Sequence, residues 1–235
     1  MIKGTVSKDE NSRFEAAEQL KHAIAYKDAK KYESALNCLD EAIKLREDYP
    51  DAWLIKALIL GRLGRCTESL RCYDKIIEID STSANAWHLK AATHSMMNQY
   101  SQAVECDQRA VQLDPNNHEI RLSLAALLQK QKKYDEAIDC YKEILKQTPD
   151  NPQIFYQIGI TLANKGQYQK ALENFEQALI LNPDFANAVL GKGLVLAKLG
   201  RTEEAKACAQ KVLEMQPQPA KDNHFDPLQQ GFRKN

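Results

Sequence analysis

Cysteine is the residue type in this chain with the most evident capacity for metal binding or disulfide chemistry. Five of the six cysteines lie on one step of 34 residues, with Asn174 at the position where another would be expected: Cys38, Cys72, Cys106, Cys140 and Cys208. Metal sites and disulfide frameworks place cysteines at short spacings, and neither uses an even step of this length. A fixed period of this size indicates a repeated structural unit.

The same spacing argues against any contact among these cysteines. Packed helices lie about 8–10 Å apart, whereas a disulfide needs Cα atoms within about 7 Å and zinc needs sulfur ligands at about 2.3 Å. The cysteines are therefore interpreted as small apolar side chains copied with the repeat. We predict no metal site and no cofactor.

Cys106, Asp107 and His94 form the other set that could do chemistry, as a nucleophile with a general base. Adjacent residues on a helix point about 100° apart, and no oxyanion donors are evident around this set. The chain also lacks a Gly-rich phosphate loop, a paired metal-ligand motif and a nucleophile elbow. We therefore predict that the protein is not an enzyme.

Other residue types recur at the same step. Six repeats fit the chain without insertion, and they start at Ala16, Pro50, Ala84, His118, Pro152 and Ala186. The twentieth place of the repeat holds alanine in all but one copy: Ala35, Ser69, Ala103, Ala137, Ala171 and Ala205. Apolar residues recur at three- and four-residue steps in both halves of each repeat, which predicts two helices.

Turn and cap signals set the expected helix ends. Gly64, Gly166 and Gly200 mark the turn within a repeat, because glycine is favoured just past a helix end. Asn151 before Pro152 predicts an N-cap followed by proline in the first turn. Ser12 and Glu15 match a capping box, so we expect the first helix to open there.

These residues resemble the tetratricopeptide repeat family. The resemblance rests on a large residue at the fourth place (Trp53, Trp87), tyrosine at the seventeenth, alanine at the twentieth and proline at the thirty-second, and it covers Ala16 to Pro217. It implies an all-α fold, a right-handed α–α superhelix (solenoid) of six helix-turn-helix units.

The expected domain organisation follows from this frame. Residues 1–12 are predicted to be a flexible N-terminus, and residues 13–217 the six-repeat array. Lys206 and Ala209 make the outer face of the last repeat more polar, so we expect the array to end there. Residues 218–235 are predicted to be a C-terminal tail, either disordered or a short helix, and its docking in a neighbour's groove is kept as an alternative.

The resemblance further implies that first helices line a concave groove that holds a partner segment. Places five and nine are four residues apart, so they share one helix face. They are mostly apolar here, and polar residues flank them. The candidate groove residues are Leu20, Ile24, Leu54, Leu58, Arg62, Asn85, His88, Leu122, Lys130, Tyr156, Ile160, Leu190 and Leu194.

Two interpretations of the apolar stripe stay open, namely binding of an amphipathic segment and packing of one first helix on the next. The third repeat departs from the others, because His94 and Asp107 stand where most of the other repeats have apolar residues. In the family these places lie between the paired helices, so we predict that His94 and Asp107 hydrogen-bond to each other.

Composition limits the class of partner. Thirty-two basic and thirty-two acidic residues give a formal net charge of zero, which implies no bulk attraction to nucleic acid or membranes. No secretory signal or membrane-spanning stretch is evident, and unpaired cysteines fit a reducing compartment, so we expect a cytoplasmic protein.

The predicted function is a protein–protein interaction scaffold or adaptor, whose groove binds an apolar or amphipathic peptide segment of a partner. A regulatory subunit that positions a separate enzyme is the alternative. Self-assembly into a homo-oligomer, such as a weak homodimer, is another.

Overall fold

The computed structural model describes residues 8–215 of the chain. Within that range the regular structure is α-helical throughout, which confirms the expected all-α class. The helices are α1 (Lys8–Asp28), α2 (Tyr32–Leu45), α3 (Pro50–Arg62), α4 (Cys66–Ile79), α5 (Ala84–Met96), α6 (Tyr100–Leu113), α7 (His118–Lys130), α8 (Tyr134–Gln147), α9 (Pro152–Asn164), α10 (Tyr168–Leu181), α11 (Ala186–Lys198) and α12 (Thr202–Met215).

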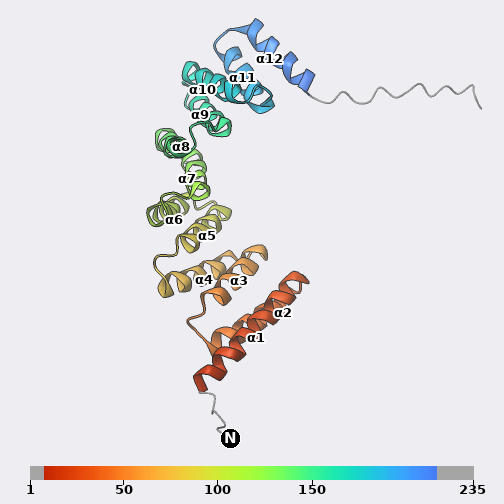
Figure 1. The fold of residues 1–235 in the computed structure, drawn as a ribbon, viewed down its shortest axis with the longest axis vertical. Helices are drawn as coiled ribbons and strands as arrows, with labels where there is room; N and C mark the ends of the chain where they lie inside the picture. Colours follow the sequence, from red (N-terminus) through yellow and green to blue (C-terminus); the bar gives the residue numbers. More distant parts are fainter. Residues whose placement is uncertain (1–7, 216–235) are drawn as a thin grey trace, which may run out of the picture. The chain divides into compact units, whose positions relative to one another are not determined.

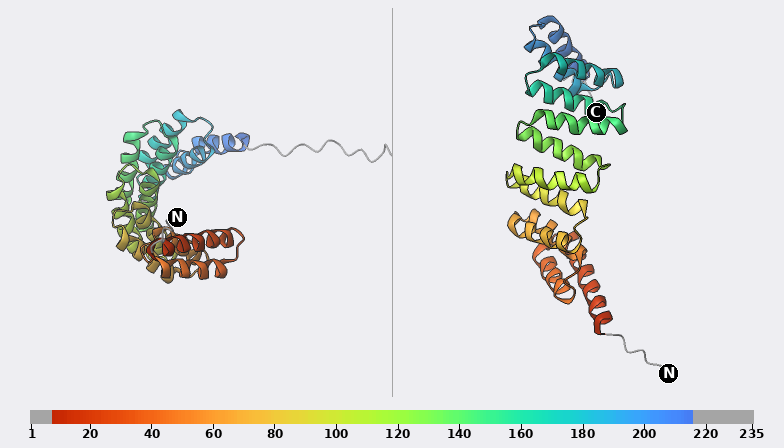
Figure 2. Two further views of the ribbon diagram at one scale, coloured as in Figure 1. Left: turned by 60° about the horizontal axis from the view of Figure 1, so that its bottom comes forward. Right: turned by 90° about the vertical axis from the view of Figure 1, so that its left-hand side faces the viewer.

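The chain forms two compact units, with the boundary between Ile144 and Leu145, inside α8. In the N-terminal unit, α1 pairs with α2, α3 with α4 and α5 with α6. In the C-terminal unit, α9 pairs with α10 and α11 with α12. The two helices of a pair lie side by side and are joined by a short turn, as Figure 1 and Figure 2 show within each unit.

Helix starts follow the predicted 34-residue frame. From α3 onward, the first helix of each pair begins at the residue where a repeat was predicted to start: Pro50, Ala84, His118, Pro152 and Ala186. The division into six repeats and the hand of the superhelix stay predictions. So does the expectation for residues 218–235, which lie outside the described residues.

The first helix departs from its expected start. Residues 8–12, predicted to be part of a flexible N-terminus, are helical, and Ser12 lies inside α1 instead of capping it. Asp9 and Glu10 stand in the first turn, where negative charge is favourable to the helix dipole. Arg13 also pairs with Asp9 at 3.1 Å, four residues earlier. Residues 1–7 lie outside the described range.

One residue in each intra-pair turn adopts a left-handed backbone conformation. These residues are again 34 apart, with φ between 58° and 84°: Lys30, Gly64, Asn98, Lys132, Gly166 and Gly200. Around Gly64 the chain closes a Schellman motif, because the Gly64 N–H donates to the Gly61 carbonyl and the Arg65 N–H to the Leu60 carbonyl. Glycine marked only three of these six left-handed positions in the sequence, and the other three hold lysine or asparagine.

Side-chain caps open three of the first helices. Asn151 accepts from the Gln153 N–H, which confirms the predicted cap of α9. Asn117 caps α7 by accepting from the Glu119 and Ile120 N–H groups. Ser83 caps α5 by accepting from the Ala86 N–H.

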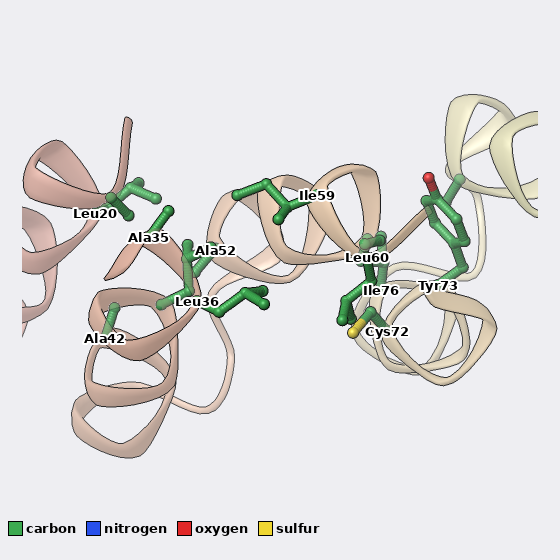
Figure 3. Close-up of a cluster of buried hydrophobic side chains, with 14 residues drawn as sticks. Leu20, Ala35, Leu36, Ala42, Ala52, Ile59, Leu60, Cys72, Tyr73 and Ile76 are labelled. Atoms are coloured by element: carbon green, nitrogen blue, oxygen red, sulfur yellow. The ribbon is translucent and has the colours of Figure 1, made fainter. Parts of the chain in front are cut away.

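Small residues form the contact between the two helices of a pair. Most alanines at the eighth and twentieth places are completely buried, among them Ala57, Ala91 and Ala103, whereas Ala205 in the last pair is half-buried. Where the twentieth place holds Ser69, its hydroxyl donates to the Ala57 carbonyl at 2.8 Å, so a polar side chain is accommodated in the same contact. Figure 3 shows part of the hydrophobic core that surrounds this contact in the N-terminal unit.

Ion pairs connect neighbouring helix pairs at equivalent places of the repeat, the seventh on the first helix and the twenty-fifth on the preceding second helix. Lys90 on α5 contacts Asp74 on α4 at 2.6 Å, and in the C-terminal unit Lys192 on α11 contacts Glu176 on α10 at 2.8 Å. The Lys90 ammonium also lies over the Trp87 ring, 5.3 Å from its centroid. The Trp at the fourth place thus helps to position this pair.

The turn geometry predicts opposite effects of exchanging residues at equivalent positions. Gly64→Ala should lower the free energy of unfolding by about 1 kcal/mol, because an L-residue pays that much for a left-handed conformation. No atom lies near enough to oppose the new methyl group, so the effect is conformational. Lys132→Gly should raise the free energy of unfolding by about 0.5 kcal/mol, because relief of the left-handed conformation of Lys132 exceeds the entropic cost of glycine. Urea denaturation of both variants measures this, and changes of equal sign would contradict it.

Candidate functional site

The predicted groove residues of the N-terminal unit lie on α1, α3, α5 and α7. Three of the apolar ones are exposed, with relative accessibilities of 37% for Ile24, 46% for Leu58 and 37% for Leu122. Leu54 is half-buried against the core. Leu20 differs from the expectation, because it is buried in the hydrophobic cluster that includes Leu36 and Ala52 (Figure 3) and offers little surface to a ligand.

The C-terminal unit, taken by itself, has predicted groove residues on α9 and α11. Leu190 and Leu194 are exposed, at 50% and 62%. Ile160 and Tyr156 are half-buried. The Tyr156 ring packs against Phe175 and Phe185, with centroid separations of 5.9 Å and 5.0 Å. Exposed leucines are therefore a feature of both units. The name "apolar stripe" is used below for these side chains within each unit: Ile24, Leu54, Leu58 and Leu122 in the N-terminal unit, and Ile160, Leu190 and Leu194 in the C-terminal unit.

Polar candidates border the apolar stripe in the N-terminal unit. Asn85, Arg62 and Lys130 are all exposed. On α3, Asp51, Leu54, Leu58 and Arg62 follow one another at three- and four-residue steps, so an acid, two leucines and a base share one face. The stripe therefore has a charged residue at each end of α3.

A cleft opens beside Leu58 and Arg62. It has a volume of about 470 Å³ and is bordered by the turn between α1 and α2, the first residue of α2 and the last turns of α3. Its lining consists of Lys27, Asp28, Lys30, Tyr32, Leu58, Ile59 and Arg62. This "turn cleft" brings two predicted groove residues together with four polar residues that the sequence had not singled out as a site.

His88 occupies the groove-facing fifth place of α5, but its ring is tied to the second helix of the pair. Its Nδ1 lies 2.8 Å from the Oδ1 of Asp107 on α6. The Asp107 side chain is completely buried, and that of His88 is 16% exposed. Among the described residues the other oxygen of Asp107 has no hydrogen-bond partner. The contact with His88 therefore has to compensate the burial of this carboxylate.

The predicted pairing of His94 with Asp107 is therefore wrong. His94 instead places its Nδ1 2.8 Å from the Oε1 of Gln99. The reason is the antiparallel arrangement about the left-handed residue Asn98. Asp107 lies nine residues beyond Asn98 and so faces His88, ten residues before it, whereas His94 is only four residues before it and faces Gln99.

Protonation of His88 is coupled to this contact. The hydrogen bond to Asp107 raises the pKa of His88 above its ordinary value, burial opposes the rise, and the nearby charges of Asp107 and Glu119 add to it. The imidazolium form is thus favoured in the folded protein, since it can neutralise the buried carboxylate.

The cysteines have the environments of small apolar side chains. Cys72, Cys106 and Cys140 are buried, and all six cysteines carry free thiols. Burial raises the pKa of Cys72 and of Cys140 to about 11. Thiols with such pKa values are poor nucleophiles at neutral pH. No cluster of potential metal ligands occurs within the described part of the chain.

A second cleft, of about 450 Å³, lies between α3 and α4 and contains none of the predicted groove residues. Trp53, Leu60 and Cys72 form its apolar part, and charged residues such as Arg71 surround it. A cleft at the equivalent place in the next pair is lined by Trp87, His94 and Cys106, among others. Both clefts follow from the recurrence of Trp and Cys at the same places of the repeat.

No helix in the described residues is long and apolar enough to cross a membrane.

Comparison with protein families accounts for most of the chain. Two models described as tetratricopeptide repeat match residues 20–84 and 162–222. A third, the TPR domain of cytochrome c-type biogenesis protein H, matches residues 76–188. The chain belongs to the tetratricopeptide repeat family. It matches none of the curated proteins with which it was compared.

Solved structures share this fold at low sequence identity. MamA 41-end from Desulfovibrio magneticus RS-1 is 19% identical, with a TM-score of 0.63 over 71% of this chain and 94% of that one. YrrB, described as a TPR protein with an unusual peptide-binding site, is 22% identical, with a TM-score of 0.62 over 77% and 93%. PilF of Pseudomonas aeruginosa is 15% identical, with a TM-score of 0.62 over 91% and 96%.

Family and fold together support a protein-interaction scaffold as the general class of function. Proteins of this family and fold are generally non-catalytic. The apolar stripe, the turn cleft and the His88–Asp107 pair are the features of this chain from which a more specific function can be argued.

The His88–Asp107 pair predicts a pH dependence of stability. Because the folded pKa of His88 is raised, its stabilising contribution is complete below the ordinary histidine pKa of 6.5 and is lost as the pH rises through the folded pKa. The comparator is the double variant His88→Leu/Asp107→Tyr, which installs the residues found at these places in the repeats on either side, Leu54 with Tyr73 and Leu122 with Tyr141.

The free energy of unfolding of the wild type, relative to this variant, should therefore fall as the pH rises from 6.5 through the raised folded pKa of His88. The variant itself should fold, since replacing a buried ion pair by well-packed apolar residues is often neutral. Urea denaturation across this range measures the difference, and a difference that is constant with pH would contradict the coupling.

Proposed function

We propose that this protein is a scaffold whose apolar stripe binds an apolar or amphipathic segment of a partner protein. The observation that carries the proposal is the exposure of leucine side chains at the fifth and ninth places of the first helices. Leu58, Leu190 and Leu194 are each about half exposed or more, at 46%, 50% and 62%. Large apolar side chains that recur in exposed, equivalent places of a repeat are unusual in the absence of a partner.

The arrangement suits an amphipathic segment better than a fully apolar one. On α3 the exposed Leu58 is followed one turn later by the exposed Arg62, and on α7 Leu122 stands between Glu119 and Lys130. The stripe is thus narrow and bordered by charge, which matches a segment with one apolar face and polar flanks. Recognition of a chaperone's C-terminal carboxylate, which one branch of the family achieves with lysines and asparagines at the fifth and ninth places, is not proposed, because Leu54 and Leu58, for example, stand at those places here.

The alternative interpretation, packing of first helix on first helix, accounts for part of the stripe only. Leu20 is buried and Leu54 half-buried, so these residues do contribute to the core. The exposed leucines do not, since their side chains keep a large accessible surface within the described structure. Burying the apolar surface of one such side chain on a ligand is worth about 1–2 kcal/mol.

Replacing two stripe leucines tests this function. A library of random short peptides is selected by display on the wild-type chain, and the enriched peptides are titrated by fluorescence anisotropy. Leu58→Gln/Leu122→Gln should weaken binding by about tenfold or more, because two apolar contacts are lost. The circular dichroism spectrum should stay unchanged, since both side chains are exposed.

The matched control is Ile79→Gln/Ile180→Gln. These isoleucines are also exposed, at 39% and 70%, but lie on the second helices α4 and α10. The control should bind the peptides as the wild type does. Failure to enrich any peptide, or equal losses in both double variants, would show that the apolar stripe is not a binding site.

A further inference from the structure

We propose that the turn cleft receives the carboxylate of an acidic side chain carried by the bound segment, next to that segment's apolar face. This inference rests on the proposed function and makes it more specific. The inference requires the bound segment to be amphipathic and to carry an Asp or Glu beside its apolar side chains. The cleft would then set how the segment is positioned on α3.

The charge of the cleft favours an anion. Among its lining residues, Lys27, Lys30 and Arg62 are cations and Asp28 is the one acid. Asp28 is already paired with Lys27, whose ammonium lies 3.3 Å from its carboxylate. An unbalanced positive charge therefore remains on Lys30 and Arg62. A carboxylate in the cleft would compensate it, with little competition from groups of the cleft itself.

The hydrogen-bond geometry provides donors at the same point. Nη1 of Arg62 donates to the Tyr32 hydroxyl oxygen at 3.1 Å, which joins α3 to the start of α2. Because that oxygen acts as the acceptor, the hydroxyl hydrogen of Tyr32 is free to be donated to a ligand. The guanidinium has further N–H groups in a planar fork. Arg62 and Tyr32 can thus bind one carboxylate from two directions.

The cleft adjoins the apolar stripe. Leu58 lines it and is exposed, and Arg62 follows Leu58 by one helical turn on the same face of α3. A segment that packs an apolar side chain on Leu58 would bring its neighbouring residues over the cleft. The two contacts are therefore made by adjacent parts of one ligand.

The equivalent place on α7 provides an internal comparison. Lys130 occupies the position of Arg62 and is also exposed, but it lines neither the turn cleft nor the clefts beside Trp53 and Trp87. The tyrosine equivalent to Tyr32 is Tyr100, and its hydroxyl donates to the Asn98 side chain at 2.8 Å, so its hydrogen is already used. The ninth place of α7 is Ala126 instead of leucine. Acid recognition is thus expected at Arg62 and not at Lys130.

The test uses the peptides enriched on the wild-type chain. Each is synthesised with its acidic residues and with Glu→Gln and Asp→Asn replacements, and is titrated against the wild type, Arg62→Gln, Tyr32→Phe and Lys130→Gln. Arg62→Gln should weaken the binding of the acidic peptides by about tenfold, because a charge-assisted hydrogen bond is lost, and should leave the binding of the amide versions unchanged. Tyr32→Phe should have a smaller effect of the same kind. Lys130→Gln should bind both versions as the wild type does.

The outcomes separate the two proposals. If the peptides depend on Leu58 and Leu122 but carry no enriched acidic residue, the carboxylate inference is overturned and the stripe stands. Equal losses of peptide affinity in Arg62→Gln and Lys130→Gln overturn it too, since diffuse charge then explains the effect. Equal losses of affinity for the acidic and the amide peptides also overturn it, since packing then explains the effect. If no peptide is enriched at all, the proposed function fails and this inference with it.

Discussion

Close packing of two antiparallel helices at small side chains is the contact on which the rest of this structure depends. Ala57 and Ala91 at the eighth place, and Ala103 and Ser69 at the twentieth, are completely or almost completely buried between paired helices. A larger side chain there would separate the helices, and a shift along the axis would bring large residues into the gap. The left-handed turn residue keeps each connection the same length. The pairing register is therefore the same from one pair to the next.

That register decides which side chains are buried and which remain available. It brings the fifth place of the first helix opposite the twenty-fourth of the second, as the His88–Asp107 hydrogen bond and the Tyr156–Phe175 ring contact both show. Part of each fifth-place side chain is thereby committed to the core. The ninth and thirteenth places lie nearer the turn and are mostly exposed, at Leu58 and Arg62 for example, although Ile160 is half-buried. A binding surface thus arises beside the turns without any change in the core.

The sequence was sufficient for the repeat frame because the frame is carried by many residues at once. Alanine at the twentieth place and the starts at Pro50 and Ala84 agree, and no single exception alters them. Individual side-chain partners were harder to predict, since they depend on the register between two helices, which helical periodicity does not report. Only His94 was predicted to pair with Asp107, whereas counting residues from the turn at Asn98 would have favoured His88. The turn cleft was missed because Tyr32 and Arg62 belong to different repeats.

Double-mutant cycles on two histidine–aspartate combinations test the register most directly. The coupling free energy of unfolding is measured at pH 6 for His88→Leu with Asp107→Leu, and for His94→Leu with Asp107→Leu. The structure predicts a coupling of about 1–3 kcal/mol for His88 with Asp107, and a coupling within about 0.5 kcal/mol of zero for His94 with Asp107. A larger coupling for His94 would contradict the register, and with it the assignment of buried and exposed places on which the binding surface rests.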